Sequence, residues 1–233
     1  MTSDLFSMVI LAGGLATRLR PLTTSMPKSL IQINGEPFIA HQLRLLAGKG
    51  IRKVVMCLGY LGEQIIEYVG DGHQFGLTVS YQFDGDQLLG TAGAIKQVLP
   101  HLDDYFFVMY GDSYLPCDYS AIQDAFLKSK KEALMTVFHN QGRWDTSNIE
   151  FLNGNIIAYD KKQSTIRMSY IDYGLSIFSK QSYDHVPLDE PYDLVPVYQA
   201  LLHRKQLAAY EVSERFYENG SHHGIGELAH YLS

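Results

Sequence analysis

Cysteine and tryptophan are scarce in this sequence. Only two cysteines, Cys57 and Cys117, occur among 233 residues, which excludes a dense disulfide framework and makes a reducing compartment the expected setting. Both cysteines are predicted to pack as small buried hydrophobic residues. The single tryptophan, Trp144, stands in a polar stretch, where we expect it either to line a pocket or to anchor a loop.

Positive charge is also limited. Lysine and arginine number 19 against 25 acidic residues, a formal net charge of -6, and this balance argues against nucleic-acid binding, which requires a basic surface. No apolar run reaches the ~18 residues needed to span a bilayer, and no basic region precedes the short apolar stretch near the N-terminus. We therefore expect no membrane anchor, no signal peptide and a cytoplasmic location.

The hydrophobic periodicity predicts strands that alternate with helices over the first 140 residues. The predicted strands cover 8–11, 54–58, 77–83, 106–110 and 134–138, and the predicted helices cover 37–48, 63–69, 92–99 and 119–128. Such alternation is typical of right-handed crossovers and of a largely parallel sheet between helices.

The pattern changes after residue 140. The sequence predicts a hairpin of strands 148–152 and 156–159 around an Asn-Gly-Asn turn, then strands 170–178 and 208–212 and helices 194–203 and 224–232. No internal repeat or long linker interrupts the chain. The expected fold is α/β, a Rossmann-like three-layer sandwich with a mostly parallel mixed central sheet, and residues 1–233 are expected to form a single domain.

The most informative segment begins where the first strand ends. It contains Leu11, Ala12, Gly13 and Gly14, followed within fifteen residues by Arg18, Arg20 and Lys28. Glycines let main-chain N–H groups approach a phosphate, and nearby cations neutralise its charge. The segment therefore predicts a polyphosphate cradle, although it lacks both the Gly-Lys-Ser/Thr of a Walker A loop and the third glycine of the dinucleotide fingerprint.

A carboxylate follows the apolar strand 106–110. Asp112 comes directly after Gly111, so it is expected at the same edge of the sheet as the glycine pair, where open α/β sheets bind ligands. There it either holds a divalent ion beside phosphates or caps the turn that begins at this point.

Three other motifs have simple structural explanations. Residues 87–95 form a glycine-bearing loop that by itself indicates a helix start with Thr91 as its cap. Asp84-Gly85-Asp86 is similar to the Asp-x-Asp of metal-dependent glycosyltransferases, but an Asp-Gly turn explains it, and we assign it no chemical role. The adjacent His222 and His223 are interpreted as an exposed helix start.

The elements Leu-Ala-Gly-Gly at 11–14, Thr-Arg-Leu at 17–19 and Pro-Lys at 27–28 stand in one order. This stretch resembles the signature of the sugar-1-phosphate nucleotidylyltransferases, and the chain is most similar to short bacterial members that act as heptose- or mannose-1-phosphate guanylyltransferases or as uridylyltransferases. The resemblance implies synthesis of an NDP-sugar and pyrophosphate from a nucleoside triphosphate and a sugar 1-phosphate with Mg²⁺, for a bacterial cell-envelope polysaccharide.

The resemblance also assigns roles on the nucleotide side. It implies that Arg18 holds the departing pyrophosphate, that Lys28 neutralises charge at the α-phosphoryl group, and that Asp112 binds Mg²⁺. Glu218 in the segment 216–221 stands where the family has a second metal-binding aspartate, and its longer side chain binds Mg²⁺ either directly or through water. The implied nucleotide contacts are Leu11, Ala12, Gly13, Gly14, Gln82, Gly90 and Thr91.

A second set of residues is implied for the sugar phosphate. Asp160-Lys161 matches the family's Glu-Lys dipeptide, whereas the spacing from Tyr159 favours Lys162; we choose Lys161. The strand 171–175 resembles the family's Asn-x-Gly strand, with Asp172 replacing the asparagine and Gly174 matching the glycine. Asn148 and Glu150 are the remaining predicted pocket residues.

Three alternatives stay open at this point. A glycosyltransferase would use Asp84 and Asp86 and release a nucleoside diphosphate. A nucleotide-sensing module without activity would be expected to lose Arg18, Lys28 or Asp112, which are all present. A cytidylyltransferase would act on a non-sugar phosphate such as phosphocholine in an acidic pocket around Asp172 and Glu190. The nucleobase, the sugar and the oligomeric state are not predicted.

Overall fold

A nine-stranded mixed sheet forms the centre of the molecule in a computed structural model, which describes residues 4–14, 19–85 and 87–233. Its parallel half is built around β1 (Ser7–Ala12), which pairs with β4 (Lys53–Leu58) and β6 (Tyr105–Tyr110). The strand β5 (Thr78–Phe83) pairs parallel to β4 at the outer side. These are the apolar segments that the periodicity predicts as buried strands.

The other half of the sheet is mixed. The strand β11 (Tyr170–Ser179) runs antiparallel to β6 and to β8 (Ala133–His139), and β12 (Leu207–Val212) runs parallel to β8. The predicted hairpin forms from β9 (Ile149–Leu152) and β10 (Asn155–Tyr159), and β9 meets β11 at Tyr170. The expected mostly parallel mixed sheet is therefore confirmed.

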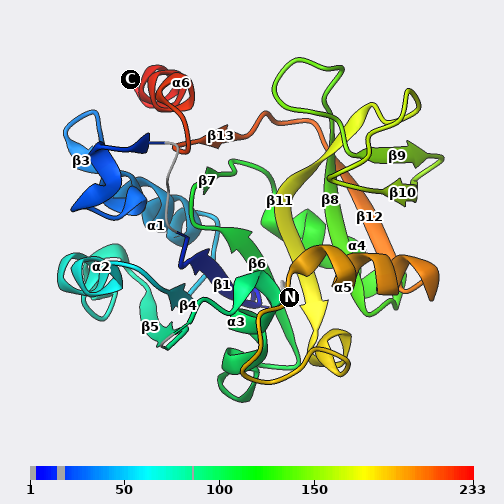
Figure 1. The fold of residues 1–233 in the computed structure, drawn as a ribbon, viewed down its shortest axis with the longest axis horizontal. Helices are drawn as coiled ribbons and strands as arrows, with labels where there is room; N and C mark the ends of the chain where they lie inside the picture. Colours follow the sequence, from blue (N-terminus) through cyan, green and yellow to red (C-terminus); the bar gives the residue numbers. More distant parts are fainter. Residues whose placement is uncertain (1–3, 15–18, 86) are drawn as a thin grey trace.

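Helices cover both faces of the sheet (Figure 1). Alternate residues of β1 separate the two cores, because Met8 and Ile10 pack with one set of helices and Val9 with the other. The first core contains side chains of α1, α2 and α4, and the second contains side chains of α3 and α5. Within the described ranges the α-helices are α1 (Phe38–Gly48), α2 (Gly62–Val69), α3 (Gly90–Val98), α4 (Tyr119–Ser129), α5 (Leu194–His203) and α6 (His222–Tyr231).

Short elements complete the fold. The 3₁₀ turns are Leu22–Thr24, Lys28–Leu30, His73–Phe75, Leu99–His101 and Lys180–Tyr183. The pair β2 (Gln32–Ile33) and β3 (Glu36–Pro37) precedes α1. A second pair, β7 (Ser113–Tyr114) and β13 (Tyr217–Glu218), places Glu218 opposite Ser113. In Figure 1, β13 and α6 accordingly lie close to β7 although they come from the end of the chain.

Two expectations about individual residues are settled by the fold. His222 and His223 are exposed at the start of α6, as predicted. Trp144 is the anchor of a loop, because its ring stacks on the guanidinium of Arg215 at 3.5 Å. Among the described residues, no helix is long and apolar enough to cross a membrane.

Candidate active site

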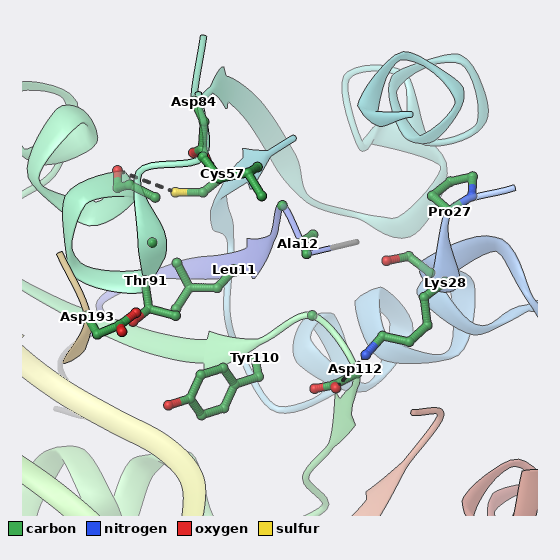
Figure 2. Close-up of a pocket in the computed structure, with 17 residues that line it drawn as sticks. Leu11, Ala12, Pro27, Lys28, Cys57, Asp84, Thr91, Tyr110, Asp112 and Asp193 are labelled. Atoms are coloured by element: carbon green, nitrogen blue, oxygen red, sulfur yellow. Dashed lines mark hydrogen bonds and ion pairs between the residues drawn. The ribbon is translucent and has the colours of Figure 1, made fainter. Parts of the chain in front are cut away.

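A cavity of about 280 Å³ opens at the carboxyl ends of the parallel strands (Figure 2). Its size is close to the lower end of the range for small-molecule sites. Residues from six separate parts of the sequence meet there, and they include most of the predicted nucleotide contacts. The lining consists of Leu11, Ala12, Gly13, Gly14, Pro27, Lys28, Ser29, Cys57, Asp84, Leu88, Gly90, Thr91, Ala94, Tyr110, Gly111, Asp112 and Asp193.

The strand ends are held together by a glycine contact. The Gly111 N–H donates to the Leu11 carbonyl at 2.9 Å, and a Cβ at Gly111 would lie 2.8 Å from that carbonyl oxygen. Any other residue at position 111 would push β6 away from β1. The close approach places Asp112 beside the segment that leads into Gly13 and Gly14.

Lys28 and Asp112 form an ion pair at one side of the cavity. The Lys28 Nζ lies 2.6 Å from Asp112 Oδ2, and their side chains are 21% and 28% exposed. Asn219 connects this pair to the end of the chain, because its side-chain Nδ2 donates to the Lys28 carbonyl and its backbone N–H donates to the Asp112 carbonyl. The predicted cation and the predicted metal-binding acid therefore lie together.

Glu218 lies next to the same pair. The position of a Cβ at Gly220 would be 2.7 Å from Glu218 Oε2, 3.5 Å from Asp112 Oδ2 and 3.7 Å from Lys28 Nζ. The Glu218 carboxylate accepts hydrogen bonds from the Gly220 N–H and the Ser221 hydroxyl. The carboxylate is thus folded back onto its own turn at the start of α6.

Two carboxylates that border one point fit a divalent cation of the hard class, which prefers oxygen ligands. Within the described ranges, no group of three or more histidine, cysteine, aspartate or glutamate side chains could hold a metal ion. A cation at this point would therefore take its other ligands from phosphate oxygens or water, as Mg²⁺ commonly does.

A second cluster surrounds Lys161. Its Nζ lies 3.3 Å from Asp172 Oδ2 and 3.4 Å from the hydroxyl of Tyr110, which also lines the cavity. Partial burial is the largest single influence on Lys161 and opposes its charge, but Asp172, Tyr110 and Tyr159 together outweigh it and raise the pKa of the amine above its ordinary value. Burial, with Asp172 nearby, raises the pKa of Tyr110 to about 12. Lys161 is therefore cationic and Tyr110 neutral near pH 7.

The remaining predicted sugar-phosphate residues lie around this cluster or beside it. Asn148 Oδ1 accepts a hydrogen bond from the Asp172 N–H at 3.1 Å, and Gly174 donates its N–H to Asp172 Oδ1. Glu150 pairs with Arg167 at 3.2 Å. Lys162 is exposed, and its N–H donates to Asp160 Oδ1. The structure thus brings Lys161 to the cluster, while the backbone of Lys162 contacts the Asp160 turn.

Some predicted residues lie elsewhere. Gln82 does not line the cavity, and its side-chain amide donates to the Phe83 carbonyl. Thr91 lines the cavity but does not cap α3, whose N-cap position is Leu89; its hydroxyl accepts from the Leu194 N–H at the start of α5. Arg18 and Asp86 are outside the described residues.

Gly90 has a different role from the one suggested by its place in the loop. Its φ is +69°, and a Cβ would lie 2.8 Å from the Tyr192 carbonyl. The same carbonyl accepts the N–H groups of Ala92 and Gly93. Gly90 therefore allows the segment before α5 to close over the start of α3, which shapes the cavity wall.

Sequence reasoning missed two carboxylates that line the cavity, Asp84 and Asp193. We assigned Asp84 to a turn without a chemical role, and the structure adds that Asp84 lines the cavity. Its position after a predicted strand was the available signal. Asp193 belongs to none of the motifs described above, and nothing in the local sequence pattern distinguishes it.

The fold and the cavity together define a class of protein. It is an α/β protein whose ligand site lies beyond the carboxyl ends of parallel strands. The glycine bend, which we define as Gly13 and Gly14, and the Lys28–Asp112 pair line this site. Such a site suits a ligand that carries phosphate groups.

Comparison with known proteins names the family within that class. Residues 7–162 match the family model described as nucleotidyl transferase, and the chain belongs to this family. A UTP–glucose-1-phosphate uridylyltransferase of Synechocystis is 29% identical over 204 residues, covering 80% of this chain and 52% of the relative. A D-glycero-alpha-D-manno-heptose 1-phosphate guanylyltransferase of Campylobacter jejuni is 28% identical over 184 residues, covering 79% of this chain and 80% of the relative. The chain thus spans about half the length of the Synechocystis relative.

Solved structures support the fold. HddC from Yersinia pseudotuberculosis superposes with a TM-score of 0.80 at 22% identity and covers 98% of this chain and 100% of its own. A putative glucose-1-phosphate thymidylyltransferase from Bacillus anthracis, solved with a sucrose, gives a TM-score of 0.84 at 22% identity. The match covers 97% of this chain and 94% of that structure's chain.

Proposed function

We propose that the protein is a sugar-1-phosphate nucleotidylyltransferase, which joins a nucleoside triphosphate and a sugar 1-phosphate into an NDP-sugar and releases pyrophosphate. The observation that carries the proposal is the connection between two cationic sites. Tyr110 lines the cavity that contains Lys28 and also contacts Lys161. This contact supports one continuous site that the two lysines would share, as a reaction between two anions requires.

The proposed reaction is attack of a sugar-phosphate oxygen on the α-phosphorus. One phosphorus–oxygen bond forms, the bond to the β-phosphate breaks, and its electrons leave with pyrophosphate. The nucleophile is already an anion, so the reaction needs no general base. The main obstacle is repulsion, which for two unit charges at 4 Å is about 4 kcal/mol at an effective dielectric of 20.

Cationic side chains lower this repulsion. We assign Lys28 to the charge at the α-phosphoryl group and Lys161 to the sugar phosphate. Arg18 is proposed for the departing pyrophosphate on the basis of sequence alone. Such groups stabilise the transition state through position and charge.

Nucleotidyltransferases of this family generally use a divalent metal, and we propose Mg²⁺ for this protein. Asp112 and Glu218 would hold it, since both carboxylates border the same point. When bound, the ion would supply positive charge to the phosphates of the two substrates. The present partners of these carboxylates are Lys28 for Asp112 and the turn before α6 for Glu218.

The test is a panel of four nucleoside triphosphates against sugar 1-phosphates and phosphocholine, with pyrophosphate release as readout. We expect Lys28→Ala to lower turnover at least ~100-fold in the active combination, about 2.7 kcal/mol in the barrier. Lys53→Ala is the matched control, because Lys53 is exposed at the amino end of β4. Near-normal turnover of Lys28→Ala would remove Lys28 from the mechanism.

The same panel separates the alternatives. Activity with phosphocholine but no sugar phosphate would indicate the cytidylyltransferase, and release of nucleoside diphosphate to an acceptor would indicate a glycosyltransferase. The names of the relatives include both uridylyl- and guanylyltransferases, so they do not select a nucleobase. A role in cell-envelope polysaccharide synthesis and a cytoplasmic location belong to the proposal.

A further inference from the structure

Asp84 lies at the end of the cavity that the proposed chemistry does not use. It follows β5, and in the view of Figure 2 it lies on the opposite side of Ala12 from Lys28 and Asp112. Its Oδ2 accepts a hydrogen bond from the Leu89 N–H at 3.2 Å and lies 3.4 Å from the position of a Cβ at Gly13. The carboxylate is therefore fixed against the glycine bend.

The walls beside Asp84 are largely apolar. Leu11, Leu88, Ala94 and Cys57 contribute to the lining of the same cavity. The Cys57 thiol donates to the Ala94 carbonyl, and burial raises its pKa well above the ordinary value, so it remains a neutral thiol. Apolar walls beside a fixed carboxylate suit a flat, aromatic ligand with a polar edge.

Asp84 is less accessible to water than the other acid at this end of the cavity. Asp193 is exposed, whereas Asp84 is intermediate in exposure, and burial raises the pKa of the Asp84 carboxyl group. Among the residues that the structure describes, Oδ1 of Asp84 has no hydrogen-bond partner. A partly desolvated carboxylate of this kind gains most from a ligand that offers hydrogen-bond donors.

We infer that Asp84 reads the nucleobase and selects guanine, so that GTP is the triphosphate used. This inference rests on the proposed function. An ionised carboxylate only accepts hydrogen bonds. Guanine offers two adjacent donors, the ring N1–H and the exocyclic N2 amine, which can bind one carboxylate together. Uracil and thymine flank their ring N–H with carbonyl oxygens, and adenine and cytosine place a ring acceptor beside their amine, so each of these bases would set a lone pair against Asp84.

The experiment is a change of base specificity by Asp84→Asn. An asparagine oxygen can accept from both the Leu89 N–H and the base N1–H, while its amide donates to a carbonyl at position 2. Xanthine carries that carbonyl in place of the guanine amine. Wild-type protein should have a higher kcat/KM for GTP than for XTP. Its kcat/KM for ITP, which lacks the amine, should be about tenfold lower than for GTP.

Asp84→Asn should lower kcat/KM for GTP by about 10- to 100-fold. The variant protein should then have a higher kcat/KM for XTP than for GTP. Asp103→Asn is the matched control, because Asp103 is exposed before the amino end of β6, and it should leave the order of nucleotides unchanged. A purely structural role for Asp84 would weaken all nucleotides alike, and that result would overturn the inference.

Two further outcomes keep the inference separate from the proposed function. Preference of the wild-type protein for UTP, dTTP, CTP or ATP, with pyrophosphate released, would overturn the choice of guanine and leave the function intact. If no triphosphate is turned over, the function fails, and calorimetric binding of GTP and XTP to both proteins then decides the inference. Tighter binding of GTP by the wild-type protein and of XTP by Asp84→Asn would support the inference. Equal affinities for GTP and XTP in both proteins would refute it.

Discussion

At the scale of single residues, the site depends on charges that are held by specific partners. Lys161 is the clearest case, because Asp172 and the hydroxyl of Tyr110 fix its amine next to the cavity. The Asp172 side chain is only 4% exposed and that of Lys161 is 36% exposed, so solvent screens the pair only in part. A phosphate group near Lys161 would add a second anionic partner to a cation that is already oriented.

This placement predicts different effects for two adjacent lysines. Lys161→Met should raise KM for the sugar phosphate at least ~10-fold, because a charge-assisted hydrogen bond to the phosphate is lost. Lys162→Met should change it less than ~2-fold, since Lys162 is exposed and its N–H contacts the Asp160 turn. Steady-state kinetics with each variant measures the difference. Equal effects, or a larger effect at Lys162, would contradict the assignment.

The sequence predicts site residues where a side chain belongs to a recognisable motif. Lys28 and Asp112 are found in this way, and the structure brings them within 2.6 Å. Asp84 also follows a predicted strand, but a turn at its Asp-Gly pair is a sufficient explanation, so we did not choose it. Whether its side chain points into solvent or into a cavity depends on tertiary contacts with Leu89 and Gly13. The local sequence pattern does not show these contacts.

At the scale of elements, the two-residue strands matter more to the site than their length suggests. The β7–β13 pair connects the loop after β6 to the last part of the chain. Asn219 then bonds both the Lys28 and the Asp112 carbonyls. Through these contacts, Glu218 and Gly220 are held beside the ion pair. The pairing thus completes the site from a segment more than a hundred residues away in sequence.

A glycine substitution tests this connection. Gly220→Ala should lower kcat at least ~10-fold, because the new Cβ would lie 2.7 Å from Glu218 Oε2 and would displace the carboxylate. Gly226→Ala in α6 is the control. No heavy atom lies within 4 Å of its Cβ position, so activity should be retained while Tm rises by about 1–3 °C. Wild-type kcat in Gly220→Ala would show that this turn does not shape the site.

The long elements were predictable and the short ones were not. Strands such as β1, β4 and β6 are continuous apolar runs, and α1 and α5 carry clear periodic patterns, so their existence follows from the sequence. Strands of two residues, such as β7 and β13, are too short to show a period. Their pairing is determined by tertiary contacts alone, and the sequence contains no local signal for it.

At the scale of the whole molecule, one sheet places two cationic sites at adjacent strand ends. The parallel half supplies the glycine bend and Asp112, and the mixed half supplies Asp172 on β11 and Lys161 after the β9–β10 hairpin. Because β6 and β11 are neighbours in the sheet, Tyr110 reaches both sites. Under the proposed function, this arrangement would bring two anionic substrates together.

The products of the reaction test this account most directly. Phosphorus NMR of a mixture of protein, Mg²⁺, the active nucleoside triphosphate and the active sugar 1-phosphate distinguishes the bonds that break and form. We predict equal amounts of free pyrophosphate and of a diphosphate that joins the nucleotide α-phosphorus to the sugar phosphate. Release of orthophosphate or nucleoside diphosphate, with the sugar phosphate unchanged, would contradict the account.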